Sequence, residues 1–266
     1  MNLSALELFE AGKLADAITA MGAEVKAAPA DITLRSRLTE FLCVAGDLDR
    51  AERQLEAIML QDSKTVVQVA TLRQFLRADE ARRQVWLAGR SPEFTTPPPA
   101  HVTLSLEALM HLRNGALAEA AECMARAAAE RPSIRGTHDD VPFEDFRDLD
   151  DLTSGVLEIM TMTGKYYWVP LEQVEEAVFE APNRPIDRAW RTAQLSVRGG
   201  PEGQVMIPST YLPPNTELTE AQRMGLETDW TEIQPDCVMG RGLRSFLVGE
   251  ESRTIMDLRH LTFTQD

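Results

Sequence analysis

The chain has 266 residues, of which 44% are apolar and 26% are charged, and its formal net charge is −15. This composition is typical of a globular protein with one or two domains, and so acidic a chain repels a phosphate backbone, which excludes nucleic acid as a partner. No apolar run approaches the roughly 18 residues that span a bilayer, and the N-terminus lacks the basic region of a signal peptide, so we expect a cytoplasmic protein without membrane insertion.

The charge is distributed unevenly along the chain. Residues 1–135 contain 16 Lys and Arg against 18 Asp and Glu, whereas residues 136–266 contain 11 against 24. This asymmetry predicts different domains in the two halves. We place a helical repeat domain at residues 1–135, an acidic connector with a helix at 136–163, and a small β-rich domain at 164–266.

A motif of the form Gly-x-Leu-x-x-Ala occurs three times in the first half, beginning at Gly12, Gly46 and Gly115. The first two glycines are 34 residues apart and the last two 69, close to twice that spacing. A period of 34 is typical of tetratricopeptide repeats, pairs of helices in which Gly ends the first helix in the left-handed conformation. The pattern therefore predicts a tetratricopeptide-like array of six to eight helices up to residue 132.

The motif is absent between the second and third copies. Residues 64–90 keep apolar side chains at helical spacing, so we expect a further helix pair there. Residues 91–101 are rich in proline and predict an extended loop that interrupts the array.

In a tetratricopeptide array the first helix of each pair lines the concave face, and such a face commonly receives a peptide or helix from a partner. Counting back from each glycine gives the candidate partner-binding residues Leu6, Phe9, Glu10, Glu40, Cys43, Val44, Leu109, Leu112 and Arg113. Taken singly, each of these side chains is more typical of the core of a helical bundle than of a partner contact.

Residues 137–152 contain seven acidic side chains against a single arginine. Asp148 and Asp150 have the spacing with which an EF-hand loop begins, but no glycine follows at the sixth position, so we expect no metal site. We expect instead a solvated acidic connector or an acidic docking face, followed by a helix over residues 152–160.

From residue 164 the pattern changes to a period of two, which predicts short strands within 165–180, 191–197, 203–212, 244–249 and 254–263. Residues 199–204 predict a hairpin turn and 216–230 one short helix. The fold class is therefore α+β, with a mainly antiparallel second domain. Its aromatic side chains could form a small core. The alternative is a binding surface made by the acidic and aromatic residues Asp148, Asp150, Tyr166, Trp168 and Trp190.

Sequence motifs of catalysis are absent. The four histidines form no H-E-x-x-H motif, His260 is expected in a strand as a structural residue, and no G-x-S-x-G, Walker A, kinase or C-x-x-C motif occurs. We therefore expect a protein that is not an enzyme and has no cofactor, with three reduced cysteines. An unrecognised hydrolytic enzyme remains the least favoured alternative.

Several stretches together resemble the ImpE family, the TagJ- or SciE-type accessory proteins of the bacterial type VI secretion system. They are "GKYYWVPLEQV" (164–174), "WRTAQLSVRGGPEGQVMIPSTY" (190–211), "TDW" (228–230) and "GLRSFLVGEE" (242–251). Phe143, Asp148, Asp150, Leu157 and Glu158 resemble the acidic motif of the family, although Asp145 and "LTSG" (152–155) depart from it.

This resemblance implies a cytoplasmic, non-enzymatic adaptor. It implies that the partner is the small subunit of the contractile sheath, bound through its N-terminal helix. It also implies that the protein assists the AAA+ ATPase that disassembles the contracted sheath, either by touching that ATPase or only through the sheath.

Overall fold

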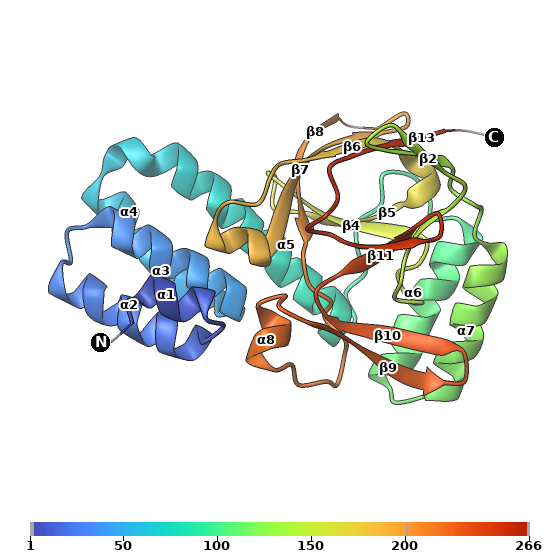
Figure 1. Cartoon of the computed structure of the whole chain (residues 1–266), viewed down its shortest axis with the longest axis horizontal. Coiled ribbons are helices and arrows are strands. Elements are labelled where there is room, and N and C mark those ends of the chain that lie inside the picture. The colour runs from blue at the N-terminus through green and yellow to red at the C-terminus, as the bar shows by residue number, and fades with distance from the viewer. Residues whose placement is uncertain (1–2, 201, 265–266) are drawn as a thin grey trace.

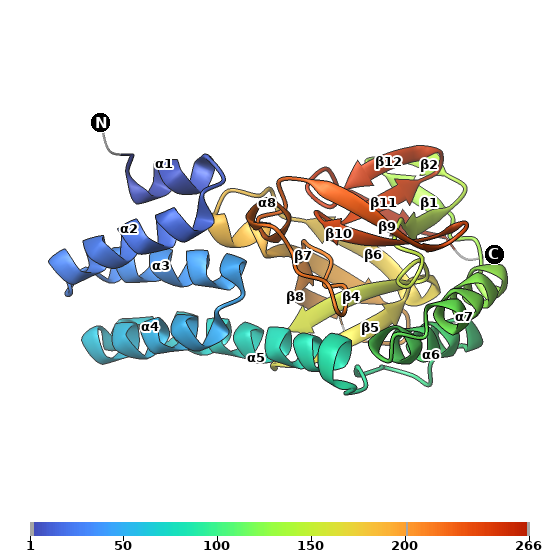
Figure 2. The ribbon, with the colours of Figure 1, turned by 90° about the horizontal axis from the view of Figure 1, so that it is seen from below.

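The computed structural model describes residues 3–200 and 202–264. Helices α1 to α4 form one end of the molecule and the β-sheets form the other, with α5 running from the first part to the second (Figure 1). Seen from below, α5 continues beneath the sheets, and α6 and α7 lie beyond its end (Figure 2). The described part of the chain thus has the expected α+β architecture, with helices first and antiparallel sheets second.

Seven α-helices precede the sheets in the described residues: α1 (Ala5–Glu10), α2 (Leu14–Ala27), α3 (Ile32–Ala45), α4 (Leu48–Gln61), α5 (Val66–Ala88), α6 (Ala100–Arg113) and α7 (Leu117–Glu130). The three motif glycines, Gly12, Gly46 and Gly115, all have φ between 74° and 78° and lie in the turns between α1 and α2, α3 and α4, and α6 and α7. A left-handed backbone of this kind favours glycine. The motif therefore marks the turn of each helix pair, as predicted.

The prediction of a helix pair within residues 64–90 is wrong. A short 3₁₀-helix, η1 (Ser63–Thr65), leads into α5, which is a single helix of 23 residues. No glycine or proline interrupts residues 66–88, and the helix ends only at Gly89, whose φ is 85°. The chain therefore has nothing that would end a first helix inside this interval.

The strands form three antiparallel sheets. Eight strands pair in the order β2-β1-β13-β6-β7-β8-β4-β5, three in the order β12-β11-β3, and β9 with β10. Their bounds are β1 (Gly136–His138), β2 (Val141–Phe143), β3 (Phe146–Asp148), β4 (Val156–Thr161), β5 (Tyr166–Pro170), β6 (Val174–Phe179), β7 (Trp190–Val197), β8 (Glu202–Pro208), β9 (Thr228–Gln234), β10 (Cys237–Gly242), β11 (Ser245–Val248), β12 (Glu251–Thr254) and β13 (His260–Phe263). Between them lie the 3₁₀-helices η2 (Leu171–Gln173) and η3 (Pro185–Arg188), and the short helix α8 (Glu220–Arg223).

The larger sheet and the three-stranded sheet share an apolar core. Phe146 of β3 stacks on Phe246 of β11, with ring centroids 5.2 Å apart, and meets Phe263 of β13 edge-on at 5.4 Å. A second core extends without a break from α1 to the sheets and includes Phe9, Trp86 and Trp168. The helices therefore share their core with the sheets, which have a further core of their own.

Residues 136–163 differ from the prediction in two ways. The acidic segment is not a solvated connector, because it forms β1, β2 and β3. The helix expected over 152–160 is instead a turn followed by β4, five of whose six residues are buried. A strand buried on both faces gives a continuous apolar run, which cannot be distinguished from a buried helix by its period. The limits placed at residues 135 and 163 remain predictions.

The later strands largely follow the predicted pattern. Strands β5, β6, β11 and β13 fall within the predicted segments, and β7 and β8 each begin one residue before theirs. The short helix α8 falls within 216–230. Of the predicted turn at 199–204, residues 199–200 follow β7 and 202–204 begin β8, while residue 201 lies outside the described residues. His260 lies in β13, as expected. The hairpin of β9 and β10 was not predicted, and neither were β1 to β3.

The proline-rich loop protects a sheet edge. Strand β5 is the last strand of the larger sheet, and Glu93 of the loop pairs with it. The Glu93 N–H donates to the Tyr166 carbonyl (3.0 Å), and its own carbonyl accepts from the Trp168 N–H (3.3 Å). The loop thus covers backbone groups that would otherwise be open to pairing with another chain.

Candidate functional site

The first set of predicted site residues lies on α1, α3 and α6, and most of its members are core residues. Phe9, Glu40, Cys43, Val44, Leu109 and Leu112 are buried, Leu6 and Arg113 are half-buried, and Glu10 is exposed. The structure brings together the residues of α1 and α3, where Phe9 stacks on Phe41 at 4.5 Å between centroids. It places those of α6 apart, at the other end of the molecule (Figure 2).

The concave face of the first two helix pairs is covered by the chain itself. Arg184, just before η3, donates from Nε to Glu40 Oε1 of α3 at 3.0 Å. The Arg188 guanidinium lies over the Phe9 ring, 5.8 Å from its centroid. Glu220 of α8 accepts a hydrogen bond from the Ala15 N–H of α2 at 3.0 Å. A partner helix could therefore occupy this face only by displacing η3 and α8.

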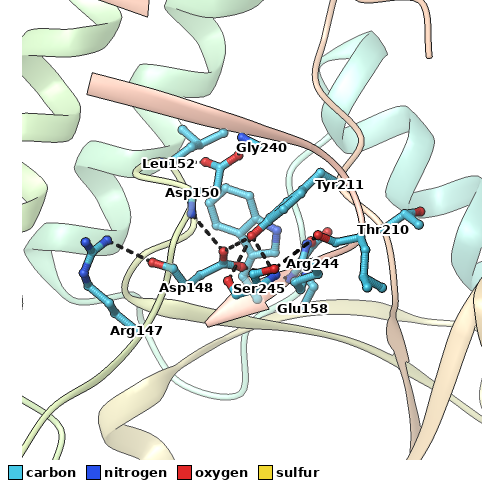
Figure 3. Close-up of polar contacts among 12 residues, drawn as sticks. Arg147, Asp148, Asp150, Leu152, Glu158, Thr210, Tyr211, Gly240, Arg244 and Ser245 are labelled. Carbon is cyan, nitrogen blue, oxygen red and sulfur yellow. Dashed lines mark hydrogen bonds and ion pairs between the residues drawn. The ribbon is translucent and has the colours of Figure 1, made fainter. Parts of the chain in front are cut away.

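A buried polar cluster joins the long helix to the sheets, and Glu158 of β4 is at its centre (Figure 3). Its carboxylate accepts hydrogen bonds from Arg82 Nε and Trp86 Nε1 of α5, each at 2.9 Å. It also accepts from the Tyr166 hydroxyl and forms an ion pair with Arg244. Arg82 further donates from NH2 to the Thr210 carbonyl at 2.8 Å. These contacts connect α5, β4, β5 and the loop before β11.

Asp148 of β3 extends the cluster. It accepts from the Tyr211 hydroxyl at 2.7 Å and lies 3.5 Å from Arg244 NH1, whose guanidinium also lies over the Tyr211 ring. The side chains of Asp148, Glu158 and Arg244 are completely buried. Buried charges are tolerated only when they are paired and hydrogen-bonded. Arg82 and Arg244 supply the ion pairs. The hydrogen bonds come from Arg82, Trp86 and Tyr166 to Glu158 and from Tyr211 to Asp148.

Asp150 lies in the turn after β3. Its carboxylate accepts hydrogen bonds from backbone N–H groups and, within the part of the chain that the structure describes, does not form an ion pair with a side chain. Its two oxygens accept from the N–H groups of Leu152 (2.9 Å) and Gly240 (2.8 Å). Burial and, after it, the neighbouring Asp148 carboxylate raise the pKa of Asp150 to about 7. Burial likewise lowers the pKa of Arg244 to about 10 and raises that of Tyr166 to about 12. In each case removal from water disfavours the charged form.

The alternative binding surface predicted from the sequence does not exist as a surface. Asp148, Asp150, Tyr166, Trp168 and Trp190 are all buried, each with at most 2% of its area exposed. The acids are buried because they accept hydrogen bonds from backbone and tyrosine, and the aromatics because they fill the joint between α5 and the sheet. Within the described residues, no group of three or more His, Cys, Asp and Glu is placed to bind a metal ion.

Sequence reasoning did not identify Arg82, Tyr211 and Arg244 as members of this cluster. One signal was present: Glu158 is a charged residue inside the apolar run "GVLEIM", and a charge in a buried strand requires a partner. The partner itself could not be predicted from the sequence, because Arg82 lies 76 residues away from Glu158.

An open hollow lies beside the covered concave face. It has a volume of about 520 Å³ and is bounded by α3, α4 and α5 on one side and by residues 180–187, β7 and β8 on the other. We call it the α3–α5 groove. A smaller hollow of about 470 Å³, on the other side of Arg184, includes Leu6, Phe9 and Glu10. Of the predicted partner-binding residues, only Glu40 lines the α3–α5 groove.

Comparison with known proteins agrees with both parts of this architecture. The family model described as ImpE protein matches residues 140–262, which include β3 and the polar cluster's Asp148, Glu158 and Arg244. This part of the chain is similar to the ImpE family. A tetratricopeptide-repeat model matches residues 8–74.

A relative and a solved structure match nearly the whole chain. The type VI secretion system accessory component TagJ of Pseudomonas aeruginosa is 29% identical over 258 residues, which cover 97% of this chain and 90% of the relative. The X-ray crystal structure of a Vibrio parahaemolyticus protein has a TM-score of 0.91 at 26% identity and covers 98% of both chains. The arrangement of helices and sheets is therefore shared with other proteins. Among the described helices, none is both long and apolar enough to cross a membrane.

Proposed function

We propose that this protein is a member of the ImpE family and a cytoplasmic accessory component of a type VI secretion system. One observation supports this most strongly: the relative named for that role aligns over both the helical array and the sheets, with 97% of this chain covered. The proposed activity is the binding of the N-terminal helix of the sheath small subunit. A second step, assistance to the AAA+ ATPase that disassembles the contracted sheath, rests on that binding.

The shape of the helical array and its attachment to the sheets support the proposed adaptor role. A tetratricopeptide-like array presents grooves between helices, and such grooves commonly bind helices of partner proteins. The buried ion pair between Arg82 of α5 and Glu158 of β4 holds this array against the sheets, so that the groove walls from both parts keep one geometry. A preorganised groove loses less conformational entropy on binding.

We further propose that the protein does not catalyse a reaction. The pKa is raised for three carboxylates, Asp148, Asp150 and Asp151. Asp148 and Asp150 are buried, and all three accept hydrogen bonds from donors of the protein. A general acid or base must instead reach a substrate proton. The perturbed pKa values therefore follow from a structural role in joining the helices to the sheets.

The proposed binding is tested by calorimetric titration of the full-length protein with a synthetic peptide of the cognate sheath subunit's N-terminal helix. We expect saturable binding with a negative heat-capacity change, because apolar surface is buried. A scrambled peptide of the same composition is the control. A folded sample that binds the native peptide no better than the scrambled one would overturn the proposal. A fragment ending at residue 135 is unsuitable, because the core continues into the sheets.

The second step requires its own measurement. Contracted sheath is incubated with the disassembly ATPase and ATP, and the rate of sheath loss is followed by sedimentation with and without this protein. We expect a faster rate in its presence. An unchanged rate alongside measurable peptide binding would limit the function to sheath binding.

A further inference from the structure

The α3–α5 groove has an apolar floor that includes Leu55 and Ile58 of α4, Phe75 of α5 and Ile186 of η3, all of them buried. Val67, at the start of α5, stands at its edge with 73% of its area exposed. Val67 therefore extends the apolar lining of the groove to its rim.

The helices and strands that line the groove offer no free edge to an extended peptide. The helix backbones of α3, α4 and α5 are bonded within each helix, and the strands that reach the groove are interior strands. Strand β7 pairs with β6 and β8, and β8 pairs with β7 and β4. A bound segment must therefore satisfy its own backbone hydrogen bonds, which a helix does and an extended strand does not.

The charged side chains of the groove are mostly acidic. Glu40, Glu180 and Asp187 line it against a single cation, Arg184. Arg184 is already engaged, since it donates to Glu40. Two negative charges remain in excess at the walls, in the half of the chain that carries most of the protein's negative charge. An electrostatically complementary occupant carries Lys or Arg.

We propose that the α3–α5 groove binds an amphipathic helix of a partner protein, with an apolar stripe on the groove floor and basic side chains toward Glu180 and Asp187. This inference rests on the proposed function, because it assigns a place and a chemistry to the partner helix. It moves the contact away from the concave face predicted from the repeat register. That face is covered by η3 and α8, whereas the groove beside it is open.

Two adjacent valines provide a matched test. Val66 and Val67 both lie at the start of α5 and are both exposed, at 45% and 73%, but only Val67 lines the groove. We expect Val67→Lys to weaken the binding of the sheath-subunit peptide at least about tenfold, because it introduces a cation beside a basic partner and removes an apolar contact. Val66→Lys is expected to change the affinity less than about twofold.

Two further measurements test whether the partner helix is basic and whether it binds in the α3–α5 groove. Glu180→Lys is expected to lower the affinity several-fold, and the wild-type affinity is expected to fall as ionic strength rises from about 0.05 to about 0.5 M. Leu6→Lys, in the neighbouring hollow, is expected to leave the affinity unchanged. Circular dichroism establishes that each variant is folded.

The outcomes separate the two proposals. If the wild-type protein binds the peptide and Val67→Lys binds equally well, the α3–α5 groove is not the site, while the proposed function stands. If Leu6→Lys alone weakens binding, the contact lies on the concave face instead. If the folded wild-type protein does not bind the peptide, the proposed function fails, and this inference fails with it.

Discussion

Arg82 of α5 and Glu158 of β4 form an ion pair, 2.9 Å from Nε to Oε1, in which both side chains are almost completely buried. The pair connects the helical array to the larger sheet, and Arg244 contacts the same carboxylate from the loop before β11. Two cations converge on one carboxylate, so the removal of its charge affects both. This geometry identifies Glu158 as the residue on which the joint between the two parts depends most.

Replacing Glu158 with glutamine is expected to destabilise the protein strongly. The amide keeps the size of the side chain but leaves Arg82 and Arg244 buried without their shared counter-ion. Breaking a buried pair in this way costs about 3 to 5 kcal/mol. The free energy of unfolding, measured by urea denaturation at neutral pH, checks this value.

The matched control is Glu176→Gln. Glu176 also lies on a strand and pairs with His260 (2.7 Å), but both side chains are more than 40% exposed. Exposed pairs contribute about 1 kcal/mol or less. Equal unfolding free energies for the two variants would show that the buried pair does not stabilise the joint.

Gly240→Ala is expected to destabilise the protein, whereas Gly22→Ala is expected to stabilise it. A methyl group at Gly240 would lie 2.3 Å from the Tyr211 ring, so Tyr211 must move and lose its hydrogen bond to Asp148. Overpacking and the lost bond together predict a cost of about 2 kcal/mol or more.

Gly22 lies inside α2, with no atom within 4 Å of the position of an added methyl group. Alanine there is expected to stabilise the protein by about 0.5 to 1 kcal/mol, because it restricts the unfolded chain and favours the helix. Thermal unfolding of both variants measures the contrast. A Gly240→Ala protein as stable as the wild type would contradict the close approach of β10 to Tyr211.

The helix pairs could be predicted from the sequence because their turns are determined locally. Gly12, Gly46 and Gly115 adopt a conformation that other residues disfavour, so the same motif returns wherever the same turn returns. The continuous α5 was missed for a related reason. The expectation of another pair came from the period alone, while the interval contained no residue that could make the turn.

The placement of the acids could not be predicted, because it depends on distant partners. Asp148 belongs to an acidic stretch that is typical of solvated carboxylates, and its partner Arg244 comes from a distant part of the chain. The apolar run around Glu158 indicates burial, but it does not show that Arg82 and Arg244 are its partners. The sequence also does not predict that η3 and α8 cover the concave face, since Glu40 and Arg184 are 144 residues apart. A repeat register indicates which residues face inward, but not whether the chain's own segments occupy that face.

The three cysteines are expected to react slowly in the folded protein. Cys43, Cys123 and Cys237 are all buried, and burial raises the pKa of each thiol, in the case of Cys237 to about 11. Since the thiolate is the reactive form, Ellman's reagent at about pH 8 should find little reaction over minutes. Addition of guanidinium chloride should then release three equivalents, with free glutathione as the rate control. Rapid titration of all three thiols without denaturant would contradict their burial.

The pH dependence of stability is expected to change when Asp150 is replaced with asparagine. Burial and the nearby Asp148 carboxylate raise the pKa of Asp150 to about 7 in the folded protein, against 3.8 for the free side chain. Between these values the folded protein binds a proton that the unfolded chain has released. The contribution of Asp150 to the free energy of unfolding is therefore largest below about pH 4 and is lost as the pH rises toward 7.

Urea denaturation gives the free energy of unfolding of the wild type and of Asp150→Asn at several pH values from about 4.5 to 7.5. The contribution of Asp150 is the difference between the two proteins in the slope of this free energy against pH. The comparison with the variant separates this contribution from those of other groups that titrate in the same range. Asp145 adds little, because its pKa is lowered by Arg131 and backbone hydrogen bonds and it is ionised in both the folded and the unfolded chain above about pH 5. The variant should lose the falling component, so its free energy of unfolding should fall less with pH than that of the wild type. Parallel curves would show that Asp150 has the same pKa in the folded and unfolded chains.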